Sequence, residues 1–145
     1  MKVFVGIDDP QSSEATLQTL IDQFDPTSTE VRTLHVVAPL IFSTQPEMAA
    51  GYAPELQDQF SEGRDSVERA ANILGNAGFK VDTSVKQGDI RETIIDSAAE
   101  CGADLILLGS HGRSGLRRFL LGSVAESMAR HASCSVEIVR GPVHR

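Results

Sequence analysis

Residues 105–112 of the chain read Leu-Ile-Leu-Leu-Gly-Ser-His-Gly, and residues 121–124 read Leu-Gly-Ser-Val. The four apolar residues form an uninterrupted run, which is typical of a strand buried on both faces of a parallel sheet. Glycines begin where this run stops, and a helix is expected to begin where the glycines end. A glycine-rich loop between a buried parallel strand and a helix N-terminus is a place to hold phosphate. The stretch therefore predicts a nucleotide site.

Strands and helices alternate along the rest of the chain. The patterns of apolar residues predict strands at Lys2–Ile7, Glu30–Val37, Phe79–Val85, Asp104–Leu108 and Ser135–Arg140. Helices are predicted between them, with starts or stops at Asp9-Pro10, Asp25-Pro26, Gly88-Asp89, Gly102 and Ser123, the last ending at Ala132. This order predicts an α/β fold with a parallel sheet and helices on both of its faces.

One segment has no clear periodicity. Residues 38–54 contain three prolines and a glycine, and a loop of this length in a compact domain is usually a lid or a mobile excursion. The helix that follows is predicted from Leu56 to Gly75 or Gly78. Gly63 lies inside it and is expected to cost about 1 kcal/mol relative to alanine.

The end of the first strand is the second place of interest. A sheet wound outward from its first strand in both directions has a switch point there, and ligands bind outside the carboxyl ends of strands at such a point. If the fourth strand lies beside the first, Asp8 and Gly109 come within about 5 Å of each other laterally. The nucleotide is expected between them.

Composition narrows the function classes. The 145 residues, 41% of them hydrophobic and 23% charged, suit one globular domain. The net charge of −7 argues against a general nucleic-acid binder, which carries a basic face. Cys101 and Cys134 have no metal-binding spacing and suit a reducing cytoplasm. The apolar run at the N-terminus is too short for a signal peptide or a membrane span.

The glycine spacing points to a family. Gly109-x2-Gly112-x9-Gly122-Ser123 matches the G-2x-G-9x-G-S/T signature of the ATP-binding members of the universal stress protein A family. The chain resembles this family over nearly its whole length, most clearly at residues 3–8, 34–37, 103–112, 121–124 and 134–140. The resemblance implies one universal stress protein domain over residues 1–145. It also implies an open five-stranded sheet of strand order 3-2-1-4-5, like that of the adenine nucleotide alpha hydrolases.

The candidate cofactor-binding residues lie mainly in the glycine loop. Its glycines would let backbone N–H groups approach phosphate, although they would equally serve a tight turn. The serines and the arginine in the same run favour phosphate. The loop candidates are Gly109, Ser110, His111, Gly112, Arg113, Ser114, Gly115, Gly122, Ser123 and Val124. The resemblance adds Asp8, whose family counterpart accepts hydrogen bonds from adenosine, and Val36, whose counterpart pairs with adenine through its backbone.

The start of the last helix has a competing interpretation. Ser123 and Glu126 fit an S-x-x-E capping box, which would use the same N–H groups that a phosphate needs. Glu126 would also repel phosphate at close range. We expect both uses in part, with Ser123 capping the helix and also reaching a phosphate oxygen.

No catalytic residue or metal ligand is predicted. His35 lies inside an apolar strand and is expected to be a core or sheet histidine with a satisfied ring. His111 is expected to line the site without acting as a catalyst. Arg117 and Arg118 are expected on the surface, and Arg113 is the arginine most suited to an anion.

The leading hypothesis is a cytoplasmic ATP-binding regulatory protein of the stress response, with Mg²⁺ brought by the ATP. The family resemblance implies a homodimer paired through residues 135–140. We expect nucleotide occupancy to bias this dimer or the linker and so to engage a regulatory protein partner, and we expect no nucleic acid or membrane as partner. One alternative is a slow ATP hydrolase or a phosphoryl or adenylyl transferase, although the loop lacks the Walker Gly-Lys-Ser/Thr ending. The other is a dimeric scaffold that binds no nucleotide. Two departures from the family are Ser135 and Asp9-Pro10-Gln11, where proline and a small glycine-serine turn are usual.

Overall fold

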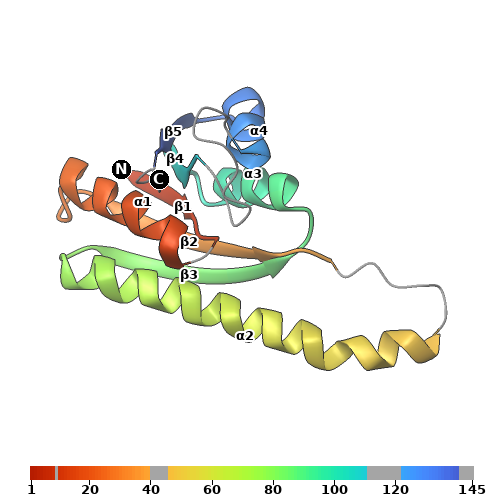
Figure 1. Ribbon diagram of the computed structural model, residues 1–145. Helices are drawn as coiled ribbons and strands as arrows, with labels where there is room; N and C mark the ends of the chain where they lie inside the picture. The colour runs from red at the N-terminus through yellow and green to blue at the C-terminus, as the bar shows by residue number, and fades with distance from the viewer. Residues whose placement is uncertain (9, 40–45, 111–121, 141–145) are drawn as a thin grey trace, which may run out of the picture.

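Five parallel strands form one sheet of order β3-β2-β1-β4-β5 in the computed structural model (Figure 1). The structure describes residues 1–8, 10–39, 46–110 and 122–140. The strands are β1 (Lys2–Gly6), β2 (Glu30–Val37), β3 (Lys80–Gln87), β4 (Leu105–Gly109) and β5 (Ser135–Val139). The predicted α/β class and strand order are confirmed, and each predicted strand lies within about two residues of its observed bounds.

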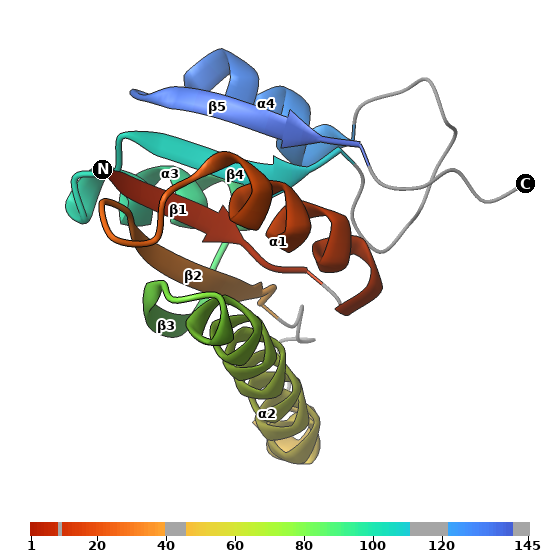
Figure 2. The same cartoon turned by 90° about the vertical axis from the view of Figure 1, so that its left-hand side faces the viewer.

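Four helices connect the strands and cover both faces of the sheet (Figure 2). They are α1 (Pro10–Gln23), α2 (Pro46–Asn76), α3 (Ile90–Glu100) and α4 (Ser123–His131). Helices α1 and α2 pack on one face, and α3 and α4 on the other. This placement follows from right-handed crossovers that change direction at β1.

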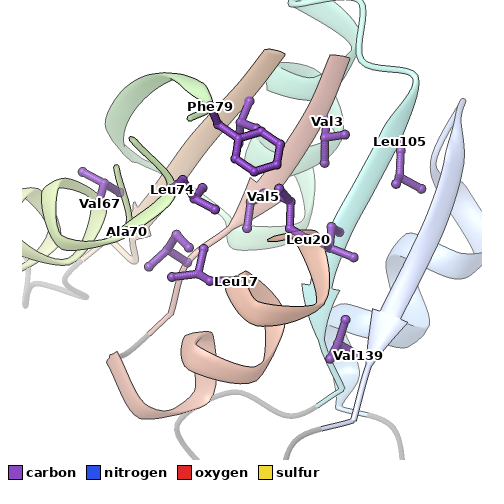
Figure 3. Packing of buried hydrophobic residues seen from close by; sticks show 13 residues of the cluster. Val3, Val5, Leu17, Leu20, Val67, Ala70, Leu74, Phe79, Leu105 and Val139 are labelled. Carbon is purple, nitrogen blue, oxygen red and sulfur yellow. The ribbon is translucent and has the colours of Figure 1, made fainter. Parts of the chain in front are cut away.

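Each face of the sheet has its own hydrophobic core. Alternate residues of β1 serve the two faces: Val3 and Val5 pack with α1 and α2, whereas Phe4 packs with α3 and α4. Figure 3 shows the first core, where leucines of α1 and α2 meet β1 and Phe79. Strand β4 alternates in the same way, and its residues 105–108 are all buried. The apolar run 105–108 is therefore a strand buried on both faces, as predicted.

The prediction for the segment before α2 is partly wrong. The linker was expected to reach Pro54, but α2 already begins at Pro46. Proline suits the first position of a helix because its missing N–H has no helical partner there. The residues that follow, Glu-Met-Ala-Ala at 47–50, are good helix formers and outweigh Gly51 and Pro54. Residues 40–45 lie outside the described part of the chain.

Helix α2 lies close to the sheet at Gly63. A Cβ built there would lie 2.6 Å from Cδ2 of His35 on β2 and 3.1 Å from Cγ1 of Val85 on β3. Gly63 is buried, so the helix backbone itself fills the space that a side chain would need. Glycine at position 63 costs helix propensity, but it allows the helix to pack closely on the sheet.

Strands β1 and β4 are direct neighbours, as the sequence hypothesis requires. Val3 pairs with Leu105 and Val5 with Leu107, so both strands end at the same edge of the sheet. The β1–β2 ladder ends at Gly6 and Leu34, while β2 continues to Val37. The sheet therefore opens at the carboxyl ends of β1 and β4, where the chain direction of the connections reverses.

Candidate functional site

A cavity of about 340 Å³ lies at the carboxyl ends of β1, β2 and β4. Its size is within the range of small-molecule sites, about 300 to 1,000 Å³. Strand ends, α1, and the starts of α3 and α4 all contribute to its walls. This is the position at which an open parallel sheet binds its ligand.

The structure gathers the described candidate residues around this single cavity. All seven of them line it: Asp8, Val36, Gly109, Ser110, Gly122, Ser123 and Val124. They come from four separate elements, so only the fold brings them together. The other five candidates, His111, Gly112, Arg113, Ser114 and Gly115, lie outside the described residues.

Backbone hydrogen bonds hold the two ends of the glycine loop together. The Ser110 N–H donates to the Val139 carbonyl of β5 at 2.8 Å. The Ser110 carbonyl then accepts from the Gly122 N–H at 2.6 Å. Ser110 is buried, with 5% of its surface exposed. The start of α4 is therefore fixed directly beside the end of β4.

The N-terminus of α4 carries no side-chain cap, and the capping-box prediction is wrong. Gly122 is the N-cap, in extended conformation, and Ser123 is already the first helical residue. Glu126 is then one position too late for a capping box. Its carboxylate instead pairs with Arg130 at 3.0 Å, one turn further along the helix. This exposed ion pair offsets part of the Glu126 charge, and repulsion of phosphate by Glu126 stays a prediction.

The open cap matters because it borders the cavity. The first N–H groups of any helix have no partner within the helix. In α4 these belong to Ser123, Val124 and Ala125, all of which line the cavity. The helix dipole adds a partial positive charge at the same point. The arrangement is suited to bind an anion through backbone amides.

Val36 presents its backbone to the open edge beside β1. The last hydrogen bond between these strands joins the Ile7 N–H to the Leu34 carbonyl at 2.8 Å. Since backbone groups alternate sides with a period of two, the N–H and C=O of Val36 point the same way as those of Leu34. The paired part of β1 has ended by that level. Val36 therefore offers one donor and one acceptor toward the cavity.

The cavity has an apolar side and a polar side. The apolar lining comes from the end of β1 and from β2, β4, α3 and α4, and it comprises Ile7, Leu34, Val36, Ile90, Ile94, Leu108, Val124 and Ala125. Helix α3 is held there by its N-cap, where the Asp89 carboxylate accepts from the Glu92 N–H at 3.1 Å. The polar lining comprises Asp8, Ser13, Thr16, Ser110 and Ser123. Such a division suits a ligand with a flat apolar part and a polar tail.

Two polar residues of the lining were missed by the sequence analysis. Ser13 and Thr16 lie on α1, both are buried, and both line the cavity. They are three residues apart and share one helix face. Their signal was a pair of hydroxyls at helical spacing just after the switch-point strand, which looks the same as ordinary helix polarity in a sequence.

His35 behaves as predicted. Its Nδ1 lies 2.9 Å from the carbonyl oxygen of Ile7, and since a carbonyl only accepts, Nδ1 carries the proton. The ring is partly buried under α2, away from the cavity lining. His35 is thus a satisfied sheet histidine.

Within the described ranges, the site offers neither a metal cluster nor a basic side chain. No group of three or more His, Cys, Asp or Glu residues among those ranges is arranged to hold a metal ion. The described residues that line the cavity include no lysine or arginine. Among the described groups, the backbone N–H groups and the helix dipole at the start of α4 are suited to meet negative charge on a ligand.

The fold and the glycine spacing agree with a comparison against protein families. The model of the universal stress protein family matches residues 1–140. The chain belongs to this family. YxiE of Bacillus subtilis, a universal stress protein, is 29% identical over 96% of the chain and 98% of its own length. A universal stress protein of Methanocaldococcus jannaschii is 36% identical over 56% of the chain, a match that spans 48% of that relative.

Solved structures of universal stress proteins share the fold. The MJ0577 protein of Methanocaldococcus jannaschii has a TM-score of 0.82 and 26% identity, covering 99% of this chain and 97% of its own. UspA of Lactobacillus plantarum has a TM-score of 0.85 at 20% identity, with 97% of each chain covered. A family member from Arabidopsis thaliana, with AMP bound, has a TM-score of 0.75 at 19% identity, covering 99% and 93%. Other neighbours were solved with dAMP and with cAMP.

Proposed function

We propose that the chain is an ATP-binding universal stress protein whose nucleotide occupies the cavity at the ends of β1 and β4. The observation that carries the proposal is the uncapped N-terminus of α4, which borders a cavity with an apolar side. A helix start without a side-chain cap leaves amide donors for a ligand. The adenine nucleotides bound by fold neighbours support the same ligand class.

The base, the sugar and the phosphates of the nucleotide each face lining groups of matching chemistry. Adenine fits the apolar side, where the backbone donor and acceptor of Val36 match the edge of the base. Asp8, at the end of β1, accepts hydrogen bonds from the sugar. The phosphates bind the amides of Ser123, Val124 and Ala125, with Gly122 and the strand end at Gly109 and Ser110 beside them. His111, Gly112, Arg113, Ser114 and Gly115 remain candidates for the phosphate end.

Magnesium enters with the nucleotide. Because no acidic cluster lies among the described residues, the ion is held by phosphate oxygens and water. When bound, it neutralises part of the charge of the triphosphate. The chain's own part is to fix the phosphates through backbone donors.

The wider proposal is that of a regulatory module. One universal stress protein domain, residues 1–145, binds ATP in the cytoplasm and pairs with a second copy through β5. Strand β5 is the last strand in the order of the described sheet, where β4 is its neighbour. Nucleotide occupancy changes the dimer surface that a regulatory protein recognises. The described residues contain no helix long and apolar enough to cross a membrane.

Calorimetry on a Gly122 variant tests the proposal. The φ of Gly122 is −62°, so a larger residue is tolerated by the backbone there. Gly122→Leu is expected to lose ATP binding, because the side chain blocks close approach to the α4 amides, while circular dichroism stays that of the wild type. Titrations with ATP, AMP and cyclic AMP rank the ligands.

Gly75→Ala is the matched control, since a Cβ at Gly75 has no atom within 4 Å and the residue is remote from the cavity. It is expected to bind ATP like the wild type. Unchanged ATP affinity in Gly122→Leu would contradict the assignment of the loop.

A further inference from the structure

The hydroxyl of Thr16 is buried and has no partner among the described residues. Thr16 is 1% exposed, and its Oγ1 makes no hydrogen bond to any part of the chain that the structure describes. Thr33, the other fully buried threonine of the core, donates from its Oγ1 to the Asp82 carbonyl at 3.3 Å. An unsatisfied buried hydroxyl is costly to a fold, and each such group in a native structure needs an explanation. The unsatisfied hydroxyl of Thr16 therefore needs an explanation, whereas the hydroxyl of Thr33 is already hydrogen-bonded.

A hydrogen-bond partner for the Thr16 hydroxyl can reach it from the cavity. Thr16 lines it, and so does Ser13, one turn earlier on the same face of α1. Helix α1 packs on the sheet face opposite to α4 (Figure 2). A ligand whose tail reaches the α4 amides therefore has a second polar wall on its α1 side.

The chemistry of this wall selects neutral hydroxyls over phosphate. Its polar groups are the hydroxyls of Ser13 and Thr16 and, at the strand end, the carboxylate of Asp8. A carboxylate repels phosphate but accepts from sugar hydroxyls. Among the described residues, the open amides at the start of α4 are the groups best suited to bind the phosphates. A sugar hydroxyl both donates and accepts, which is what a threonine hydroxyl needs.

We propose that Thr16, supported by Ser13, binds a ribose hydroxyl of the nucleotide and makes the site selective for it. This inference rests on the proposed function, since it concerns the same cavity. The ligand satisfies Oγ1 when it binds, so the free protein bears the cost of the open hydroxyl and the complex does not. Thr16 is thus a specificity residue, beside the backbone groups that hold the phosphates.

The test uses Thr16→Val, which keeps the shape and the β-branch but removes the hydroxyl. ATP, 2′-deoxy-ATP and 3′-deoxy-ATP are titrated into the full-length wild type and the variant by calorimetry. The variant is expected to bind ATP about 5- to 15-fold more weakly, which is the usual worth of one hydrogen bond. For the deoxy analogue that lacks the partner hydroxyl, wild type and variant are expected to bind equally. Thr16→Ser is expected to restore the affinity for ATP.

Thermal unfolding without ligand supplies an independent readout. Thr16→Val is expected to raise Tm by about 3 °C, because it removes an unsatisfied polar atom. The matched control Thr33→Val is expected to lower Tm, since it leaves the Asp82 carbonyl without its partner, and to bind ATP like the wild type.

The outcomes separate the two proposals. Equal ATP affinity in wild type and Thr16→Val would overturn the inference and leave the proposed function standing. An affinity loss of the same size for ATP and both deoxy analogues would overturn the ribose assignment. Failure of the wild type itself to bind ATP would overturn the proposed function, and the inference with it.

Discussion

Single residues decide how closely α2 approaches the sheet. Gly63 leaves no room for a Cβ beside His35, and the His35 ring is tied to the Ile7 carbonyl. Helix propensity alone would favour alanine over glycine by about 1 kcal/mol. The steric term opposes it, because crowding a packed core costs about 1 to 3 kcal/mol. The steric term is expected to win, since the ring cannot move without losing its hydrogen bond.

Two glycines of the same helix therefore respond in opposite directions. Gly63→Ala is expected to lower the free energy of unfolding by about 1 kcal/mol. Gly75→Ala is expected to raise it by about 0.5 to 1 kcal/mol, because a Cβ there meets no atom within 4 Å. Denaturant titrations of the three proteins measure both changes. Stabilisation by Gly63→Ala would show that the contact with His35 does not limit the packing of α2.

At this scale, sequence reasoning reached only part of the site. Six of the seven described candidates were predicted from the glycine spacing and the strand ends, which have local signals. Val36 came only from the family resemblance. Thr16 was missed, because an unpartnered hydroxyl depends on what surrounds it in space. The role of Ser123 was misassigned by one position, since capping depends on where the helix actually starts. Helix propensity predicted a cost for glycine at position 63 but did not explain why a glycine is needed there.

Among the elements, the start of α4 combines two opposing demands. A side-chain cap would stabilise the helix, whereas a bound phosphate needs the same amides free. Gly122→Asp is expected to raise the free energy of unfolding by roughly a few tenths of a kcal/mol, as a new N-cap. It is also expected to abolish ATP binding, because it places a carboxylate at the anion site. Gly122→Asn supplies a neutral cap as control and is expected to bind ATP more tightly than Gly122→Asp. Equal ATP affinity in the two variants would contradict an electrostatic role for this cap.

The turn between α1 and β2 depends on pH through Asp25. Its Oδ1 accepts from the N–H and the hydroxyl of Thr27 at 3.0 and 2.9 Å, and these bonds lower the pKa of the carboxyl. A lowered folded-state pKa gives stability that is present above the unfolded pKa, about 3.9, and is lost as pH falls through the folded value. Asp25→Asn is expected to be less stable than the wild type at pH 7. The two proteins are expected to converge as pH falls through the lowered folded-state pKa of Asp25 and the carboxyl becomes protonated. Urea titrations across this range measure the difference, and a constant gap down to pH 2 would contradict the assignment.

Element existence and order were predictable because they rest on hydrophobic periodicity. The buried run at 105–108 and the alternation of strands with helices led to the correct α/β sheet. The start of α2 was not predictable in this way, because proline and glycine, at Pro46, Gly51 and Pro54, usually interrupt a helix. Proline at the first helical position is compatible with a helix, so the residues around it determine whether the helix forms.

At the scale of the whole molecule, binding and chemistry are separate questions. The described cavity lining holds backbone donors and hydroxyls, and its one carboxylate, Asp8, lies on the sugar side in the proposed arrangement. Release of phosphate from ATP is accordingly expected below about 1 s⁻¹, the low end of typical enzymes. A phosphate-release assay at saturating ATP and Mg²⁺ measures it. Turnover well above that rate would favour an ATP hydrolase over a regulatory module.

The most direct test of the central claim is a crystal structure grown with excess ATP and Mg²⁺. We expect nucleotide density in the cavity of about 340 Å³, with the base against Val36 and the phosphates at the amides of Ser123 and Val124. A cavity filled by the protein's own side chains, or a nucleotide bound elsewhere on the molecule, would contradict it.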